Sequence, residues 1–151
     1  MSDHKTFGGI PTENTQYESS KVVLLPIPYD GTSTYGKGAD LGPNAILSAA
    51  ENMELYDIET DSEVYLNGIY LAPEIKEKSS PEAVAKQVEA AVEKHLNQEK
   101  FVTILGGEHS VSIGAIRAFK SKYDALTVLQ LDAHSDLRPT YQGSTHNHAC
   151  A

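Results

Sequence analysis

Acidic residues and histidines close together in 132–136 (DAHSD) are the part of this sequence best suited to chemistry. The segment follows an apolar run, and extended backbone would point Asp132, His134 and Asp136 to the same side. Two carboxylates and an imidazole are ligands that Mn²⁺, Zn²⁺ or Fe²⁺ accepts. An exposed turn that contains these residues by chance is the alternative. The dry strand expected before the motif makes unpaired charges costly, which favours a cation partner.

A second cluster, 106–110 (GGEHS), ends another apolar run. Its glycines allow close approach of the backbone, and Ser110 is suited to cap a following helix. A lone histidine in a glycine turn more often hydrogen-bonds locally than it binds a metal. Two adjoining strand ends, however, would bring His109 to Asp132, His134 and Asp136. Together the two clusters predict a metal site.

A third segment, 144–150 (STHNHAC), contains His146 and His148. Because the ordinary pKa of imidazole lies near neutrality, a histidine beside a metal-activated nucleophile is suited to proton transfer. The local sequence does not choose between the two histidines, and an exposed loop would explain them equally well. Cys150 is the only cysteine and is better explained as a small apolar residue than as a nucleophile.

Alternating strands and helices are expected to position these clusters. Short apolar runs predict buried strands at 22–28, 101–105 and 126–131, and a further short strand is expected near 64–71. Since helical segments separate these runs, the sequence predicts an α/β fold with a parallel sheet. Ligands of such sheets bind beyond the carboxyl ends of the strands, where both acidic and histidine clusters fall.

Helices are predicted at 43–53, 81–96 and 110–123. The second has the clearest signals, because Ser80 is a good N-cap and Pro81 a good first helical residue. Its apolar stripe is expected to face the core rather than a cofactor: Val84, Val88, Ala91, Val92 and Leu96. His95 and His4 are expected to face solvent, and residues 1–20 are expected to form a polar N-terminal arm.

Length and charge limit the possible functions. The chain has 151 residues, which suits one domain, and a net charge of −9, which argues against nucleic acid and is compatible with a small cationic substrate. No apolar run approaches the ~20 residues that a membrane helix needs. With one cysteine and no recognisable secretory signal, a cytoplasmic location is expected.

The paired motifs GGEHS and LDAHSD, with PYDGTSTYGKGADLGP near the start, resemble the ureohydrolase family of arginases and agmatinases, and agmatinases most closely. The resemblance implies an arginase-like three-layer α/β/α fold with a mostly parallel sheet. Residues 1–151 would be the N-terminal portion of a single ureohydrolase domain. Family members are longer, and their second half completes the metal site, so the 151-residue chain alone is expected to be inactive.

The same resemblance assigns roles to residues. It implies two Mn²⁺ ions, one bound by His109, Asp132 and Asp136 and the other by Asp132 and His134, with His148 transferring protons. It implies hydrolysis of agmatine to putrescine and urea by a metal-bridging hydroxide, a step of polyamine biosynthesis. Arginine, guanidinobutyrate and formiminoglutamate remain alternative substrates. A homo-oligomer, trimer or hexamer, is expected, and Glu108 stands where many members have aspartate.

Overall fold

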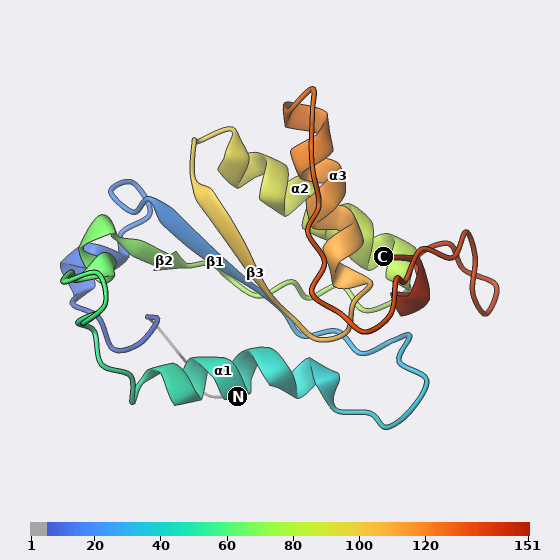
Figure 1. Ribbon diagram of the computed structural model, residues 1–151, viewed down its shortest axis with the longest axis horizontal. Coiled ribbons are helices and arrows are strands. Elements are labelled where there is room, and N and C mark those ends of the chain that lie inside the picture. The colour runs from blue at the N-terminus through green and yellow to red at the C-terminus, as the bar shows by residue number, and fades with distance from the viewer. Residues whose placement is uncertain (1–5) are drawn as a thin grey trace.

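Strand β1, Val22–Ile27, is the centre of a three-stranded parallel sheet with the order β2-β1-β3 (Figure 1). The computed structural model describes residues 6–151. Strand β3, Phe101–Gly106, pairs with β1 along its whole length, from Val22 with Phe101 to Ile27 with Gly106. Strand β2, Ile69–Leu71, pairs with the first half of β1. The strands predicted at 22–28 and 101–105 are therefore confirmed, and 64–71 is a 3₁₀ turn at Val64–Asn67 followed by β2.

Three helices connect and cover these strands. Helix α1 is Gly42–Ala50, α2 is Pro81–Leu96 and α3 is Val111–Lys122. The Ser80 hydroxyl accepts a hydrogen bond from the Ala83 amide, as expected of an N-cap. Ser110 precedes α3 but makes no such capping bond, because its hydroxyl donates to Glu108 instead. No helix among residues 6–151 has both the length and the apolar character to cross a membrane.

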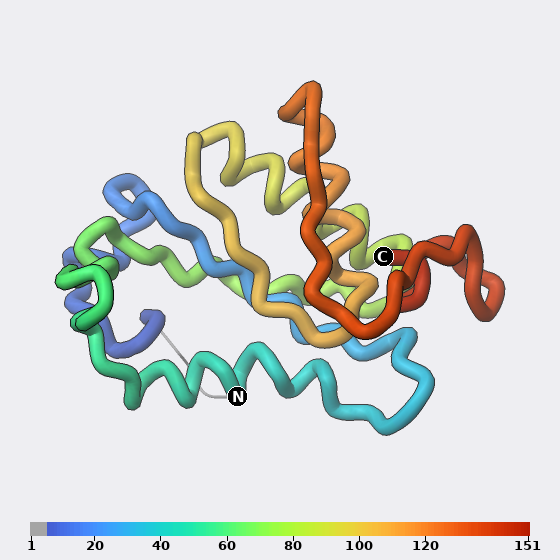
Figure 2. Tube along the Cα trace, in the orientation of Figure 1, coloured from blue at the N-terminus to red at the C-terminus, as the bar shows by residue number. Residues whose placement is uncertain are grey.

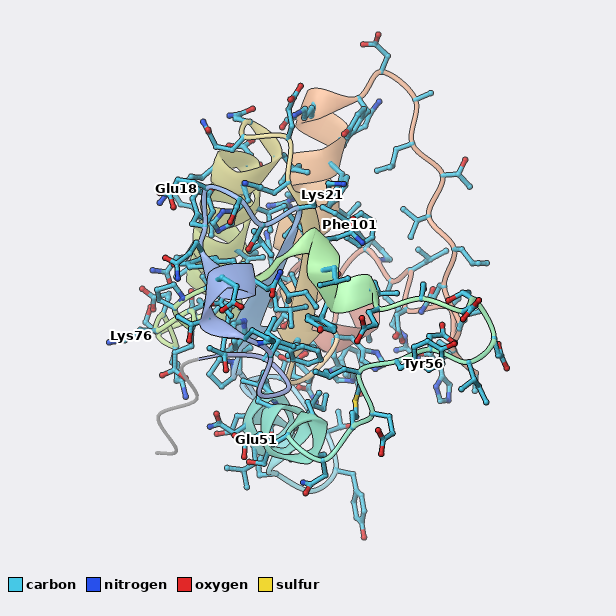
Figure 3. All side chains as sticks on the ribbon, turned by 90° about the vertical axis from the view of Figure 1, so that its left-hand side faces the viewer. Glu18, Lys21, Glu51, Tyr56, Lys76 and Phe101 are labelled. Atoms are coloured by element: carbon cyan, nitrogen blue, oxygen red, sulfur yellow. The ribbon has the colours of Figure 1, made fainter. Side chains whose placement is uncertain are left out.

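The order of the strands places helices on both faces of the sheet. From β1 the chain passes through α1 to β2, on one side of β1. From β2 it passes through α2 to β3, on the other side of β1. Since crossovers between parallel strands share one hand, the two helices must lie on opposite faces. Figure 1 and the end-on view of Figure 3 show α1 on one face and α2 with α3 on the other. Strands β1 and β3 thus lead to helices on opposite faces, and ligands of α/β sheets commonly bind beyond the carboxyl ends of two such strands.

The core lies between the sheet and α2. Alternate side chains of β1 face it, and four of the predicted stripe residues of α2 are buried with them: Val23, Leu25, Ile27, Val84, Val88, Val92 and Leu96. Helices α2 and α3 approach closely at Gly114, where an added Cβ would lie 2.2 Å from the carbonyl oxygen of Ala85. A glycine is therefore required for this packing distance.

His95 lies in this core, and its predicted exposure was wrong: it is only 6% exposed. Its Nδ1 atom is 3.0 Å from the hydroxyl of Tyr17, whose ring also packs edge-on against Tyr70. Lys100 donates to the carbonyl oxygens of Tyr17 and Ser20. The chain before β1 covers one side of His95, which a single-helix pattern could not reveal. His4 lies outside the described residues.

The segment 126–131 is not a strand, contrary to its apolar sequence. Figure 2 shows it running alongside α3 before it turns near the start of that helix. A buried strand needs side chains covering both of its faces, and here Leu129 is 82% and Leu131 90% exposed. A cavity of about 410 Å³ separates the segment from Ile104 and Phe119.

Candidate metal centre

The turn after β3, which carries His109, is held against the end of β1. Two amides continue the pairing beyond the strand: Gly107 donates to Ile27 at 3.0 Å and Glu108 donates to Tyr29 at 3.0 Å. An added Cβ on Gly107 would lie 2.0 Å from the carbonyl oxygen of Tyr29. Glycine therefore permits the contact that holds this turn against β1.

His109 meets the second acidic cluster directly. Its Nδ1 atom lies 2.8 Å from Oδ2 of Asp136 and 3.5 Å from Oδ2 of Asp132. One ligand atom from each of the three residues lies within 4.8 Å of the others. Asp136 adopts the left-handed backbone conformation, with φ at +49°, which is uncommon for a residue other than glycine. The two clusters therefore converge even though strand 126–131 does not form.

The carboxylate of Asp132 is stabilised in its charged form. A backbone hydrogen bond from the amide of His134, 2.7 Å from Oδ1, is the largest cause that lowers the pKa of Asp132. The imidazoles of His109 and His134 lower this pKa further. The expected dry strand before the motif does not determine the environment of Asp132, since the segment that precedes it is exposed. A charged carboxylate is the form that binds a cation.

His134 is less closely associated with the cluster than expected. Its Nδ1 atom is 3.5 Å from Oδ1 of Asp132, and its side chain is 82% exposed. The backbone bends at 132–134, where the Asp132 carboxylate accepts from the His134 amide. The expected alternation of an extended chain is therefore wrong here, and His109, Asp132 and Asp136 converge without the imidazole of His134.

The three-residue cluster fits a divalent transition metal. Bonds of about 2.0–2.2 Å would hold neighbouring ligand atoms roughly 3 to 4 Å apart, and two of the observed separations are 2.8 and 3.5 Å. A cavity of about 410 Å³ adjoins the cluster and is lined by Gly107, His109, Asp132, Asp136 and Ala151 among others. The donor set of one nitrogen and two oxygens suits Mn²⁺, Zn²⁺ or Fe²⁺. The role of these residues as ligands remains a prediction.

The two histidines of 144–150 face different elements. The amide of His148 donates to the Thr32 hydroxyl at 2.8 Å, and the imidazole ring of His148 packs edge-on against Tyr141. The ring of His146 lies 3.8 Å from Glu82, at the start of α2. His148 is thus associated with the loop after β1, whereas His146 is associated with α2.

Two buried residues beside the site were not predicted. Glu108 is 6% and Thr32 9% exposed, and the Thr32 amide donates to the Glu108 carboxylate at 3.3 Å. The sequence contained one signal for Glu108, an acidic residue within a glycine-rich turn. Nothing in the aperiodic loop 29–38 distinguished Thr32.

Comparison with known proteins assigns the family. The model of the arginase family matches residues 20–151. The N(1)-aminopropylagmatine ureohydrolase of Synechocystis sp. is 37% identical over an alignment of 143 residues, and the match covers 90% of this chain and 47% of that protein. The agmatinase of Pyrococcus horikoshii is 33% identical over 133 residues, covering 85% of this chain and 44% of that protein.

Among solved structures, the agmatine ureohydrolase of Thermoplasma volcanium superimposes with a TM-score of 0.82 and 32% identity. The match covers 99% of this chain and 49% of that one. The chain spans about half the length of these relatives. Family motifs, parallel sheet and superposition agree, and the chain belongs to the arginase family.

Proposed function

We propose that the complete protein is a metal-dependent ureohydrolase that releases urea from a linear guanidino compound, with agmatine as its substrate. The convergence of His109, Asp132 and Asp136 on one point carries this proposal. N(1)-aminopropylagmatine is the second candidate, because the Synechocystis relative is named for it. Both molecules are cations, and the net charge of −9 favours their approach.

His109, Asp132 and Asp136 would hold one Mn²⁺ ion, and Asp132 with the exposed His134 would contribute to a second. Divalent metals bound there would supply the nucleophile for hydrolysis at neutral pH, because they lower the pKa of a water ligand. The charged state of Asp132, maintained by the His134 amide, suits this role.

The reaction adds water to the guanidinium carbon and breaks its bond to the alkyl nitrogen. The products are urea and an alkylammonium ion. The leaving nitrogen starts with one hydrogen, so both protons of the added water must reach it. We assign this transfer to His148, whose backbone amide is bound to Thr32 in the loop after β1. His146, directed toward Glu82, ranks second.

Residues 1–151 by themselves are proposed to bind at most one metal weakly and to be inactive. Four candidate ligands, only two of them carboxylates, would leave two divalent cations under-coordinated. The exposed apolar side chains of 126–131 would also favour aggregation or pairing. A homo-oligomer and a cytoplasmic location remain predictions.

Urea release tests the proposal. The complete gene product, supplied with Mn²⁺, is assayed with agmatine and with N(1)-aminopropylagmatine, and Asp132→Asn serves as the inactive comparison. We expect urea and the matching amine from at least one substrate. Absence of urea from both substrates under metal-saturated conditions would refute the function. Activity of the 151-residue chain alone would refute only the statement that it is inactive.

A further inference from the structure

Glu108 has an unusual environment for a carboxylate. It is 6% exposed and accepts three hydrogen bonds, from the Thr32 amide and from the hydroxyl and amide of Ser110. A buried carboxylate is costly unless hydrogen bonds compensate the lost water. Here the compensation comes from two segments, the loop after β1 and the start of α3.

Thr32 extends this arrangement to the third segment. Its amide donates to Glu108, while its hydroxyl accepts from the amide of His148 at 2.8 Å. The same hydroxyl lies 3.4 Å from Nδ1 of His148. The buried Thr32 therefore bonds through its backbone to Glu108, 76 residues later in the chain. Through its side chain it bonds to His148, 116 residues later.

We infer that Glu108 and Thr32 are positioning residues that hold His148 relative to the end of β3. This inference rests on the proposed function, in which His148 transfers the proton to the leaving amine. Glu108 directly precedes His109 in the chain, so the link connects the proton-transfer segment to the same turn that carries a metal ligand.

The arrangement also orients the imidazole. Since Nδ1 faces the Thr32 hydroxyl and the ring packs edge-on against Tyr141, Nε2 is the nitrogen left for the substrate. A displacement of about 1 Å at such a group costs up to about 100-fold in rate. Loss of the hydroxyl should therefore affect the chemical step more than substrate binding.

The test compares Thr32→Val with Thr32→Ser in the complete gene product. Valine keeps the shape and the amide donor but lacks the hydroxyl, whereas serine keeps the hydroxyl. Thr34→Val is the matched control for amide exchange, because Thr34 is in the same loop but exposed. Amide hydrogen exchange at His148, kcat, KM and the pH profile of kcat are measured for each, with Mn²⁺ and agmatine or N(1)-aminopropylagmatine as probes.

We expect Thr32→Val to accelerate exchange of the His148 amide at least about tenfold and to lower kcat about 10- to 100-fold, with KM changed less than about threefold. Thr32→Ser should restore both, and Thr34→Val should leave exchange at His148 unchanged. Glu108→Gln should accelerate exchange of the Thr32 amide. If Glu108→Gln does not fold, the comparison of Thr32→Val with Thr32→Ser still tests the inference.

Unchanged exchange at His148 in Thr32→Val would overturn the inference, as would unchanged kcat with an unchanged pH profile. If the unsubstituted protein releases no urea, the proposed function fails. The exchange measurement then still decides whether the hydroxyl positions His148.

Discussion

Nδ1 of His109 lies 2.8 Å from Oδ2 of Asp136, although 27 residues separate them in the chain. His109 follows a regular strand, whereas Asp136 lies in a loop with a left-handed backbone. The contact therefore joins a rigid element to an irregular one. Asp132, 3.5 Å from the same nitrogen, completes the cluster.

Removal of a candidate ligand should weaken Mn²⁺ binding. We expect Asp136→Asn or His109→Ala to reduce the affinity more than about tenfold, because outer-shell changes alone commonly cost 10- to 100-fold. Titration followed by calorimetry or by the paramagnetic resonance of free Mn²⁺ measures this. Asp124→Asn, an exposed acid outside the cluster, should leave the affinity unchanged. Equal affinities for all variants would contradict a site at this position.

Gly114→Ala should destabilise the contact between α2 and α3. The new Cβ would lie 2.2 Å from the carbonyl oxygen of Ala85, so the helices must separate, at a cost of about 1–3 kcal/mol. Lys86→Ala is the control, since Lys86 is exposed on α2 and its replacement should change the free energy of unfolding by less than about 0.5 kcal/mol. Urea unfolding measures both free energies. If Gly114→Ala leaves the free energy of unfolding unchanged, α2 and α3 are packed less closely in the protein than the 2.2 Å contact requires.

Asp30 should stabilise the loop after β1 when it is charged. Burial would raise the pKa of Asp30, but hydrogen bonds from Ser33, Gly38 and Ala39 together with the charge of Lys37 lower it overall. Stability from a lowered carboxylate pKa is present above the ordinary value of 3.8 and is lost as pH falls through the folded value.

Asp30→Asn should therefore reduce the free energy of unfolding by roughly 1–3 kcal/mol at pH 7, and the difference should narrow as pH falls below 3.8. Denaturant unfolding at several pH values measures it. Asp124→Asn should show no such loss. If the difference in the free energy of unfolding does not change with pH, Asp30→Asn destabilises the loop through altered packing and not through loss of the charge.

Acidification should destabilise the protein through His95. Burial first, and then the charges of Lys94 and Lys100, lower the pKa of His95 below 6.5. The unfolded chain therefore binds a proton more readily, and the free energy of unfolding falls as pH decreases from 6.5 toward the folded value. We expect His95→Gln to show a smaller fall between pH 7.5 and 5.5 than the unsubstituted protein.

Unfolding in urea with a chelator present measures this pH dependence. Lys86→Gln is the control, because Lys86 is exposed on the same helix and its replacement leaves His95 in place. If His95→Gln keeps the full fall in stability, other histidines must cause it.

Local pattern was sufficient for the elements with a continuous apolar run or a periodic apolar stripe. Strands β1 and β3 follow from short apolar runs, and α2 follows from its Ser80 cap and its periodic stripe. The motifs also indicated that His109 would meet Asp132 and Asp136, but they placed His134 in the same cluster, which the bend at 132–134 prevents.

Other features depended on contacts between distant residues. The apolar run 126–131 remained outside the sheet because nothing among residues 6–151 covers its second face. His95 was buried by Tyr17, which lies 78 residues earlier. The sequence by itself thus determined the type of fold and the candidate ligands, through local periodicity and residue chemistry. Only the tertiary structure decided that Glu108 and Thr32 link His148 to this site, because that link consists of hydrogen bonds between loops without any local pattern.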